Sequence, residues 1–78
     1  MRTVEFRLKD EFIKLGQVLK AAGVAENGVD AKYMIQDGKV LVNGEKELQR
    51  GKKIHPGDEV VCGDIKIIIS AGKSPEDA

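Results

Sequence analysis

The sequence predicts an α+β fold in which two helices pack on a small, mainly antiparallel sheet. One observation is that the apolar residues change along the first part of the chain from a period of two to a helical period. Another is that short apolar segments separated by turn residues follow. At 78 residues the chain can bury one core but cannot divide it. We therefore expect a single domain over residues 1–70.

The first elements are predicted from residues 3–22. Residues 3–8 alternate apolar and charged side chains, which predicts a half-buried strand at the edge of the sheet. From Asp10 onward the apolar residues recur at helical spacing, so we expect the first helix to begin there, with acids in its first turn. Gly23 lies just past its predicted end, where a glycine often caps a helix. The apolar stripe of this helix is Phe12, Leu15, Val18, Leu19 and Ala22.

A second, shorter helix is predicted between Asn27 and Gly38. Asn27 can accept a hydrogen bond as the N-cap, and Asp30 follows three residues later. The inward stripe is then Ala31, Met34 and Ile35, which leaves Lys32, Tyr33 and Gln36 outside, with Lys39 immediately after the helix.

The rest of the chain predicts short strands joined by tight turns. The turns are marked by Asn43-Gly44, Pro56-Gly57-Asp58 and Gly63-Asp64. The apolar segments between them are residues 40–42, a segment that begins at Ile54, and residues 59–62 and 65–69. Residues 71–78 are small, polar or charged, so we expect a disordered tail.

Composition argues against an enzyme and against a metal or cofactor site. The chain has one Cys, one His and few hydroxyl side chains, so no nucleophile beside a base is visible. We expect Cys62 to be a small apolar strand residue in a reducing compartment, and His55 to be a solvated turn residue. No apolar stretch is long enough for a signal peptide or a membrane span, which predicts a soluble cytoplasmic protein.

The charges are distributed unevenly although the formal net charge is zero. Residues 1–53 hold eleven basic and eight acidic side chains, whereas residues 54–78 hold two and five. One surface can therefore be basic and bind a polyanion. We expect structured RNA to bind a basic face made by the second helix and the 50–53 loop. The expected phosphate contacts are Lys32, Lys39, Arg50, Lys52 and Lys53. With so few aromatic residues, we do not expect several bases to stack on the protein.

A longer run of residues resembles a known family. It comprises residues 14–24, Ala31, Ile35, the segment Gly38-x-Val40-x-Val42-Asn43-Gly44 and Gly57-Asp58. The pattern resembles the RNA-binding domain of ribosomal small-subunit protein four, or αL motif, which also occurs in pseudouridine synthases, a tyrosyl-tRNA synthetase tail and a heat-shock ribosome factor. The resemblance covers roughly residues 12–62. It implies the αL-motif RNA-binding fold, with the two helices and the following hairpin against RNA.

By position, the resemblance adds Lys14, Gln17 and Asn43 as candidate RNA contacts. The Ser-Arg pair that usually opens the second helix of the family is replaced by Asn27, Gly28 and Val29, which lowers the expected affinity. In this respect the chain is more similar to small stand-alone bacterial members of the YbcJ and YaaA type. The resemblance implies ribosomal or transfer RNA as the partner, with association with the ribosome or an assembly factor.

Two other classes remain open. The same basic face could bind an acidic partner protein, as an interaction or assembly module. Small sulfur carriers of the β-grasp type share segments like Val42-Asn43-Gly44-Glu45 and Gly57-Asp58-Glu59-Val60. Those carriers end in Gly-Gly, whereas this sequence ends in Glu76-Asp77-Ala78, which makes the carrier the weaker alternative.

Overall fold

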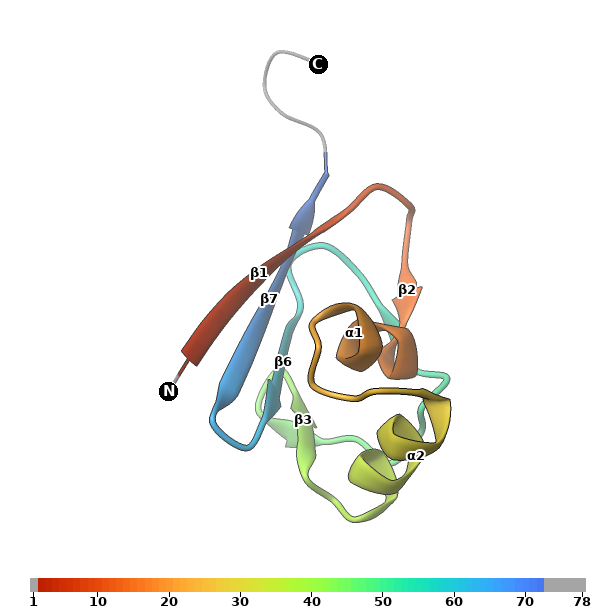
Figure 1. The fold of residues 1–78 in the computed structure, drawn as a ribbon. Helices are drawn as coiled ribbons and strands as arrows, with labels where there is room; N and C mark the ends of the chain where they lie inside the picture. Colours follow the sequence, from red (N-terminus) through yellow and green to blue (C-terminus); the bar gives the residue numbers. More distant parts are fainter. Residues whose placement is uncertain (1, 73–78) are drawn as a thin grey trace.

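The computed structural model describes residues 2–72 and has two helices against a five-stranded sheet. The helices are α1 (Leu15–Ala21) and α2 (Gly28–Gln36). The strands are β1 (Arg2–Leu8), β2 (Ile13–Lys14), β3 (Val40–Val42), β4 (Glu45–Lys46), β5 (Lys53–Ile54), β6 (Glu59–Cys62) and β7 (Ile65–Ala71). The large sheet has the order β1-β7-β6-β3-β4, and β2 pairs with β5 in a separate two-stranded sheet. Figure 1 shows both helices on one side of the large sheet, so the predicted fold class is confirmed.

Strand β1 lies at the edge of the sheet, as predicted, and pairs in parallel with β7. All other strand pairs are antiparallel. The register runs from Arg2 opposite Ile65 to Leu8 opposite Ala71. Strand β7 thus continues one residue past the expected domain boundary, and the N–H of Gly72 donates to the carbonyl of Leu8 at 2.7 Å. The rest of the expected tail, residues 73–78, lies outside the described residues.

The predicted start of the first helix is wrong. Helix α1 begins at Leu15, and the residues before it form β2, which pairs antiparallel with β5. Phe12, which fits the helical stripe, is 36 % exposed, whereas Ile13 packs against the core. The end of the helix is as predicted, because Gly23 has a positive φ of 77° and its N–H donates to the carbonyl of Lys20.

Helix α2 has the predicted bounds. The side chain of Asn27 accepts a hydrogen bond from the N–H of Asp30 at 2.9 Å, which caps the first turn. Ala31 and Ile35 are fully buried, so the predicted inward stripe is the one that packs against α1 and the sheet.

The turn between β3 and β4 has the geometry that its sequence predicts. Asn43 and Gly44 have positive φ angles of 53° and 85°. Two successive positive φ angles are what a type I′ hairpin turn requires. The turn places Val42 directly opposite Glu45 in the ladder.

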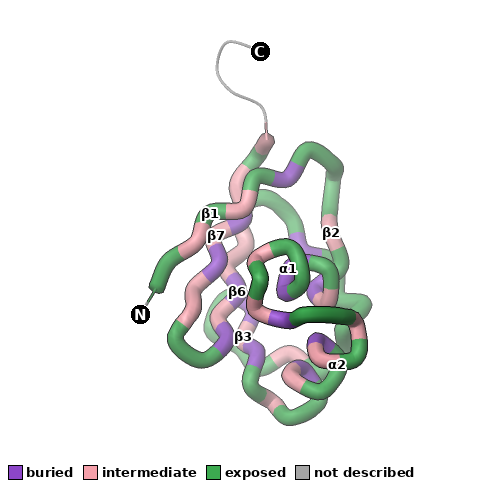
Figure 2. Tube along the Cα trace, viewed as in Figure 1, coloured by how far each residue is buried: buried purple, intermediate pink, exposed green. Residues whose placement is uncertain are grey.

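The core of the described region is apolar, and no polar or charged residue within residues 2–72 is buried. Figure 2 shows the buried positions on the inner sides of the helices and along the central strands. The largest fully buried side chains are Leu15, Leu19, Ile35, Ile54, Ile67 and Ile69. Every charge of the described region is therefore at least partly accessible to solvent and to a partner.

Candidate nucleic-acid interface

Backbone hydrogen bonds attach the 50–52 segment to the start of α1. The N–H of Leu15 donates to the carbonyl of Lys52 at 2.9 Å, and the N–H of Gly16 donates to the carbonyl of Arg50 at 3.0 Å. No side chain caps this helix at Lys14. The loop carbonyls therefore satisfy donors that the first turn of a helix leaves free. As a result, the basic segment predicted at residues 50–53, which we call the basic loop, lies beside the start of α1.

The short ladder between β2 and β5 adds a second connection between the same two segments. Lys14 on β2 lies directly opposite Lys53 on β5. Residues opposite each other in a ladder have their side chains on the same side of it. The ladder therefore brings together one cation from the start of the first helix and one from the basic loop.

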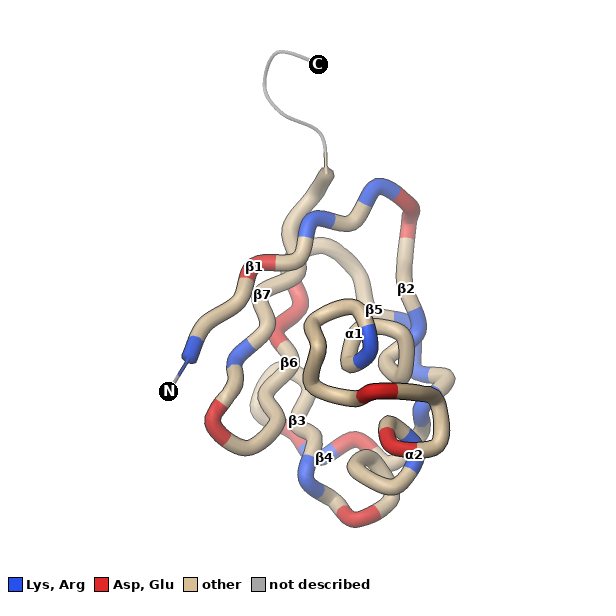
Figure 3. The backbone as a smooth tube through the Cα atoms, in the orientation of Figure 1, with Lys and Arg blue, Asp and Glu red and all other residues tan. Residues whose placement is uncertain are grey.

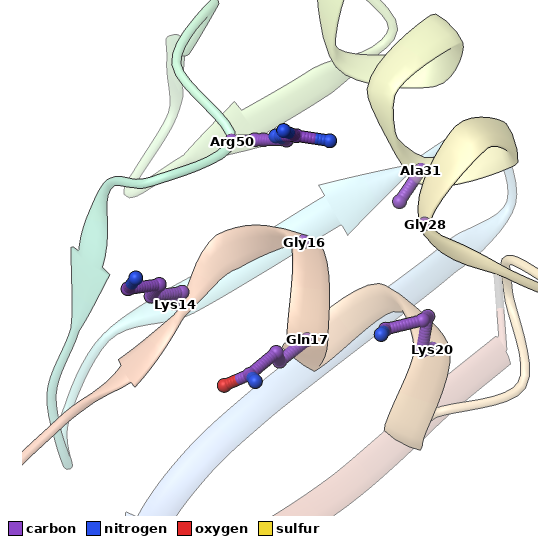
Figure 4. Close-up of a pocket in the computed structure, with 7 residues that line it drawn as sticks. All are labelled: Lys14, Gly16, Gln17, Lys20, Gly28, Ala31 and Arg50. Carbon is purple, nitrogen blue, oxygen red and sulfur yellow. The ribbon is translucent and has the colours of Figure 1, made fainter.

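A hollow of about 240 Å³ lies between α1, α2 and the basic loop. Its polar lining residues are Lys14, Gln17, Lys20 and Arg50. On α2, Gly28 has no side chain and Ala31 has only a methyl group, so that side of the hollow stays open. Figure 4 shows the Arg50 side chain reaching towards α2, with Gln17 and Lys20 on α1 facing the same space. We call this hollow the helix groove.

A second hollow, of about 260 Å³, lies on the outer side of α2. It is lined by Lys32 and Gln36 from the helix, by Leu48 and Arg50 from the segment after β4, and by Ile35. Arg50 lines both hollows, so they adjoin at its side chain. The structure thus places Lys32, Lys14 and Gln17 around Arg50, on one continuous surface that carries both polar and apolar groups.

The cations of this surface have no acidic partner among the residues that the structure describes. The ion pairs among the described residues are Arg7 with Glu5, Lys66 with Glu59, and His55 with Asp58, at 3.5, 3.5 and 3.8 Å. Figure 3 shows Lys and Arg positions following one another along the side of the molecule from β2 and β5 towards α2. These cations are therefore free of ion pairs within the described residues, which favours an anionic ligand.

Lys39 lies apart from this surface. It lines a third hollow with Arg2, Met34 and Cys62, and that hollow shares no lining residue with the other two. Burial raises the pKa of the Cys62 thiol, and the nearby charge of Lys39 offsets only part of that shift. The structure therefore does not bring Lys39 together with Arg50.

The side chain of Asn43 is bonded within the protein. Its amide nitrogen donates to Asp58 Oδ1 at 3.1 Å, and its amide oxygen accepts from the N–H of Glu59 at 2.9 Å. These bonds hold the β3–β4 turn against the start of β6. The residue thus stabilises a turn, and an additional contact with RNA remains a prediction.

Sequence reasoning missed Lys20 as a groove residue. It follows Gln17 by three positions, so the two side chains are neighbours on one face of the helix. That spacing could have identified it. Leu48, which is 58 % exposed beside the second hollow, had no comparable signal because it lies in an irregular segment.

Other site types find little support in the described region. Within residues 2–72, no group of three or more His, Cys, Asp or Glu side chains could hold a metal ion. In the same range, the helices are too short and too polar to cross a membrane.

Comparisons with known proteins agree on the fold. A family model described as "S4 domain" matches residues 6–70. A Bacillus subtilis (strain 168) protein described as "Probable ribosome maturation protein RlbA" is 46 % identical over 50 residues, which cover 64 % of this chain and 70 % of that protein. The solution structure of YbcJ from E. coli, reported to reveal an αL motif involved in RNA binding, matches with a TM-score of 0.66 and 31 % identity. That match covers 91 % of this chain and 89 % of YbcJ, so the expected αL-motif fold is confirmed.

Proposed function

Because the chain belongs to the S4 domain family, we propose that it binds structured RNA without catalysing a reaction on it. The observation that carries the proposal is the arrangement of four cations around two adjoining hollows, with no acidic partner in the described region. These cations are Lys14, Lys20, Lys32 and Arg50. Phosphate contacts of this kind supply the sequence-independent part of RNA affinity.

The geometry supports folded RNA better than an extended single strand. The cations come from β2, α1, α2 and the basic loop, so they surround a hollow and do not follow one line. Such an arrangement fits phosphates that an RNA fold brings close together. Lys52 and Lys53 follow Arg50 in the chain and add positive charge beside the surface in this proposal. Lys39 and Asn43 contribute less in this proposal, because one lies at a separate hollow and the other is already hydrogen-bonded.

Ribosomal RNA is the first RNA to test and transfer RNA the second. One relative is described as a ribosome maturation protein, and YbcJ is described as having a motif involved in RNA binding. We therefore propose that the protein acts in the cytoplasm, in association with ribosomal particles or an assembly factor.

The test is binding to ribosomal RNA fragments and tRNA at about 50 and 200 mM salt. With about four phosphate contacts, we expect the affinity to fall roughly a hundredfold between these two concentrations. The variant with Arg50, Lys52 and Lys53 changed to alanine should bind far more weakly at both.

The matched control removes three charges from another part of the molecule. Arg2, Arg7 and Lys66 lie on β1 and β7, outside both hollows of the proposed interface. Their triple alanine variant should keep the wild-type affinity. Equal losses in the two variants, or no binding by the wild type at low salt, would contradict the proposal.

A protein-interaction module is the second candidate. The outer side of α2 carries Val29 and Tyr33, four residues apart and 58 % and 60 % exposed, which is an apolar pair next to Lys32. Exposed aromatic residues are common at protein interfaces. Binding to an acidic protein that RNA does not displace would favour this function over RNA binding.

A further inference from the structure

The β2–β5 ladder has an inner side and an outer side of different chemistry. On the inner side, Ile13 packs against the core and Ile54, directly opposite, is fully buried. Successive residues of a strand point to opposite sides, so Lys14 and Lys53 lie on the outer side. We call this side, extended by one residue on each strand, the outer ladder face. It consists of Phe12, Lys14, Lys53 and His55.

Phe12 and His55 occupy the extended positions of this face. The next pair of residues along the ladder register is Phe12 with His55, and their ring centroids are 6.2 Å apart with an angle of 50° between the ring planes. The ammonium of Lys53 lies over the Phe12 ring, 4.8 Å from its centroid. The four side chains therefore form one patch, in which the flat apolar ring of Phe12 lies beside His55 and two lysines.

The fold does not account for the position of Phe12. Its side chain is 36 % exposed, and it is not among the partly buried apolar residues that pack against the core. Neighbouring Ile13 provides the contact with the core instead. An aromatic ring that adds little to the core yet lies beside a cation at the surface has the properties of a ligand contact.

The cations of the face are also unexplained by the fold. Lys14 and Lys53 lie directly opposite each other, and like charges in this position destabilise a ladder. Neither has an ion pair among the described residues. The nearby acids are Asp10 and Glu11, which precede Phe12, and Asp58, which accepts the backbone N–H of His55. An anion between the two lysines would remove their repulsion.

We propose that Phe12 stacks on one unpaired nucleobase of the bound RNA, while the adjoining phosphate lies between Lys14 and Lys53. The inference rests on the RNA-binding function proposed above. Lys14 lines the helix groove as well, so the nucleotide lies where the groove and the outer ladder face meet. The contact between an exposed lysine and a ring is weak, so the phosphate can draw Lys53 away from Phe12 as the base stacks. The preferred RNA is therefore a helix interrupted by an unpaired nucleotide.

The experiment compares two RNA hairpins that differ only in a single bulged nucleotide. Wild-type protein should bind the bulged hairpin about tenfold more tightly than the fully paired one. Phe12→Ala and Phe12→Leu should both lose this preference and retain the affinity for the paired hairpin. Leucine keeps an apolar side chain but lacks the flat ring on which a base stacks.

A fluorescent variant reports on stacking directly. The chain contains no tryptophan, so Phe12→Trp introduces a single reporter that can still stack. We expect this variant to keep the preference, and the bulged hairpin to quench its fluorescence more strongly than the paired hairpin does.

The outcomes separate this inference from the proposed function. If the wild type binds both hairpins equally, or if Phe12→Leu keeps the preference, no base stacks on Phe12 and the inference is overturned while RNA binding stands. If Phe12→Ala weakens both hairpins equally, the ring only supports the ladder, and the inference is overturned in the same way. If neither hairpin nor any ribosomal fragment binds at low salt, the proposed function fails, and the inference with it.

Discussion

Asn43 and Asp58 show how an exposed and a half-buried side chain connect a turn to a strand. The amide of Asn43 donates to the carboxylate of Asp58, which also accepts the N–H of His55 at 2.7 Å. Burial raises the pKa of Asp58, but the hydrogen bonds from His55 and Asn43 and the charges of His55 and Lys52 together hold this pKa below its ordinary value. The carboxylate form of Asp58 therefore stabilises the folded protein.

This pair predicts a pH dependence of stability. A carboxyl group with a lowered pKa in the folded state takes up a proton on unfolding, so its contribution is present above its ordinary pKa of 3.8 and is lost as the pH falls below that value. Denaturant unfolding of wild type and Asp58→Asn between about pH 6 and pH 2.5 measures the difference. The free energy of unfolding of the wild type should fall more steeply below about pH 4 than that of the variant. Parallel curves would show that Asp58 contributes nothing.

The positions of the candidate contacts could be predicted only in part. Some of these positions depend on neighbours in the sequence, and others depend on residues far away in the sequence. Lys32 was predicted correctly to lie on the outer side of α2, because helical spacing is local. Lys39 lies only a few residues later, but the strand after Gly38 directs it to a hollow formed with Arg2 and Cys62. Neither partner is near Lys39 in the sequence, so no local pattern could indicate it.

At the scale of elements, α1 depends on the basic loop for its start. The apolar spacing that predicted a longer helix includes Phe12, but pairing with β5 turns Ile13 and Lys14 into a strand. The spacing of apolar residues within one segment does not indicate that this segment pairs with a distant strand. Helix α2, in contrast, has a side-chain cap from Asn27 and the bounds that its sequence predicts.

The connection between loop and helix can be tested by native-state hydrogen exchange. Amides in the first turn of a helix usually exchange readily, because they have no partner within the helix. The amides of Leu15 and Gly16 donate to loop carbonyls, so they should be protected nearly as well as the middle of the central strands. The internal comparison is the first-turn amide of Val29 in α2, which donates no hydrogen bond to a loop carbonyl within the described residues. Exchange of Leu15 and Gly16 as fast as Val29 would show that the loop detaches readily.

At the scale of the whole molecule, the sequence predicted the layers of the fold better than the location of its charged surface. The apolar pattern predicted the layers, because nearly every buried position belongs to a strand or helix stripe visible in the sequence. The neutral total charge gave no indication of the basic surface. That surface exists because the loop, β2 and the two helices meet on one side of the molecule, which requires contacts between distant segments.

We expect strand β1 to belong to the same cooperative unit as the rest of the domain. It contributes a seven-residue ladder to β7 and the buried side chain of Leu8. Deletion of residues 1–9 should abolish the single cooperative unfolding transition and expose the β7 edge to self-association. Thermal unfolding and size-exclusion chromatography measure both effects, with Arg7→Ala, an exposed change in the same strand, as the control. A truncated protein that unfolds cooperatively as a monomer would contradict this prediction.

The pairing of β1 with β7 also determines the order in which the domain can assemble. The two helices and the β3–β4 hairpin are made of contacts between residues close in the chain, which form early. Within the domain, the residues of β1 are synthesised before the rest, whereas their partners at positions 65–71 are synthesised near the end. During translation this strand remains an unpaired edge until almost the whole domain has emerged. Pairing β1 with β7 closes a loop that contains all the residues between them. We expect this step to limit the rate of folding.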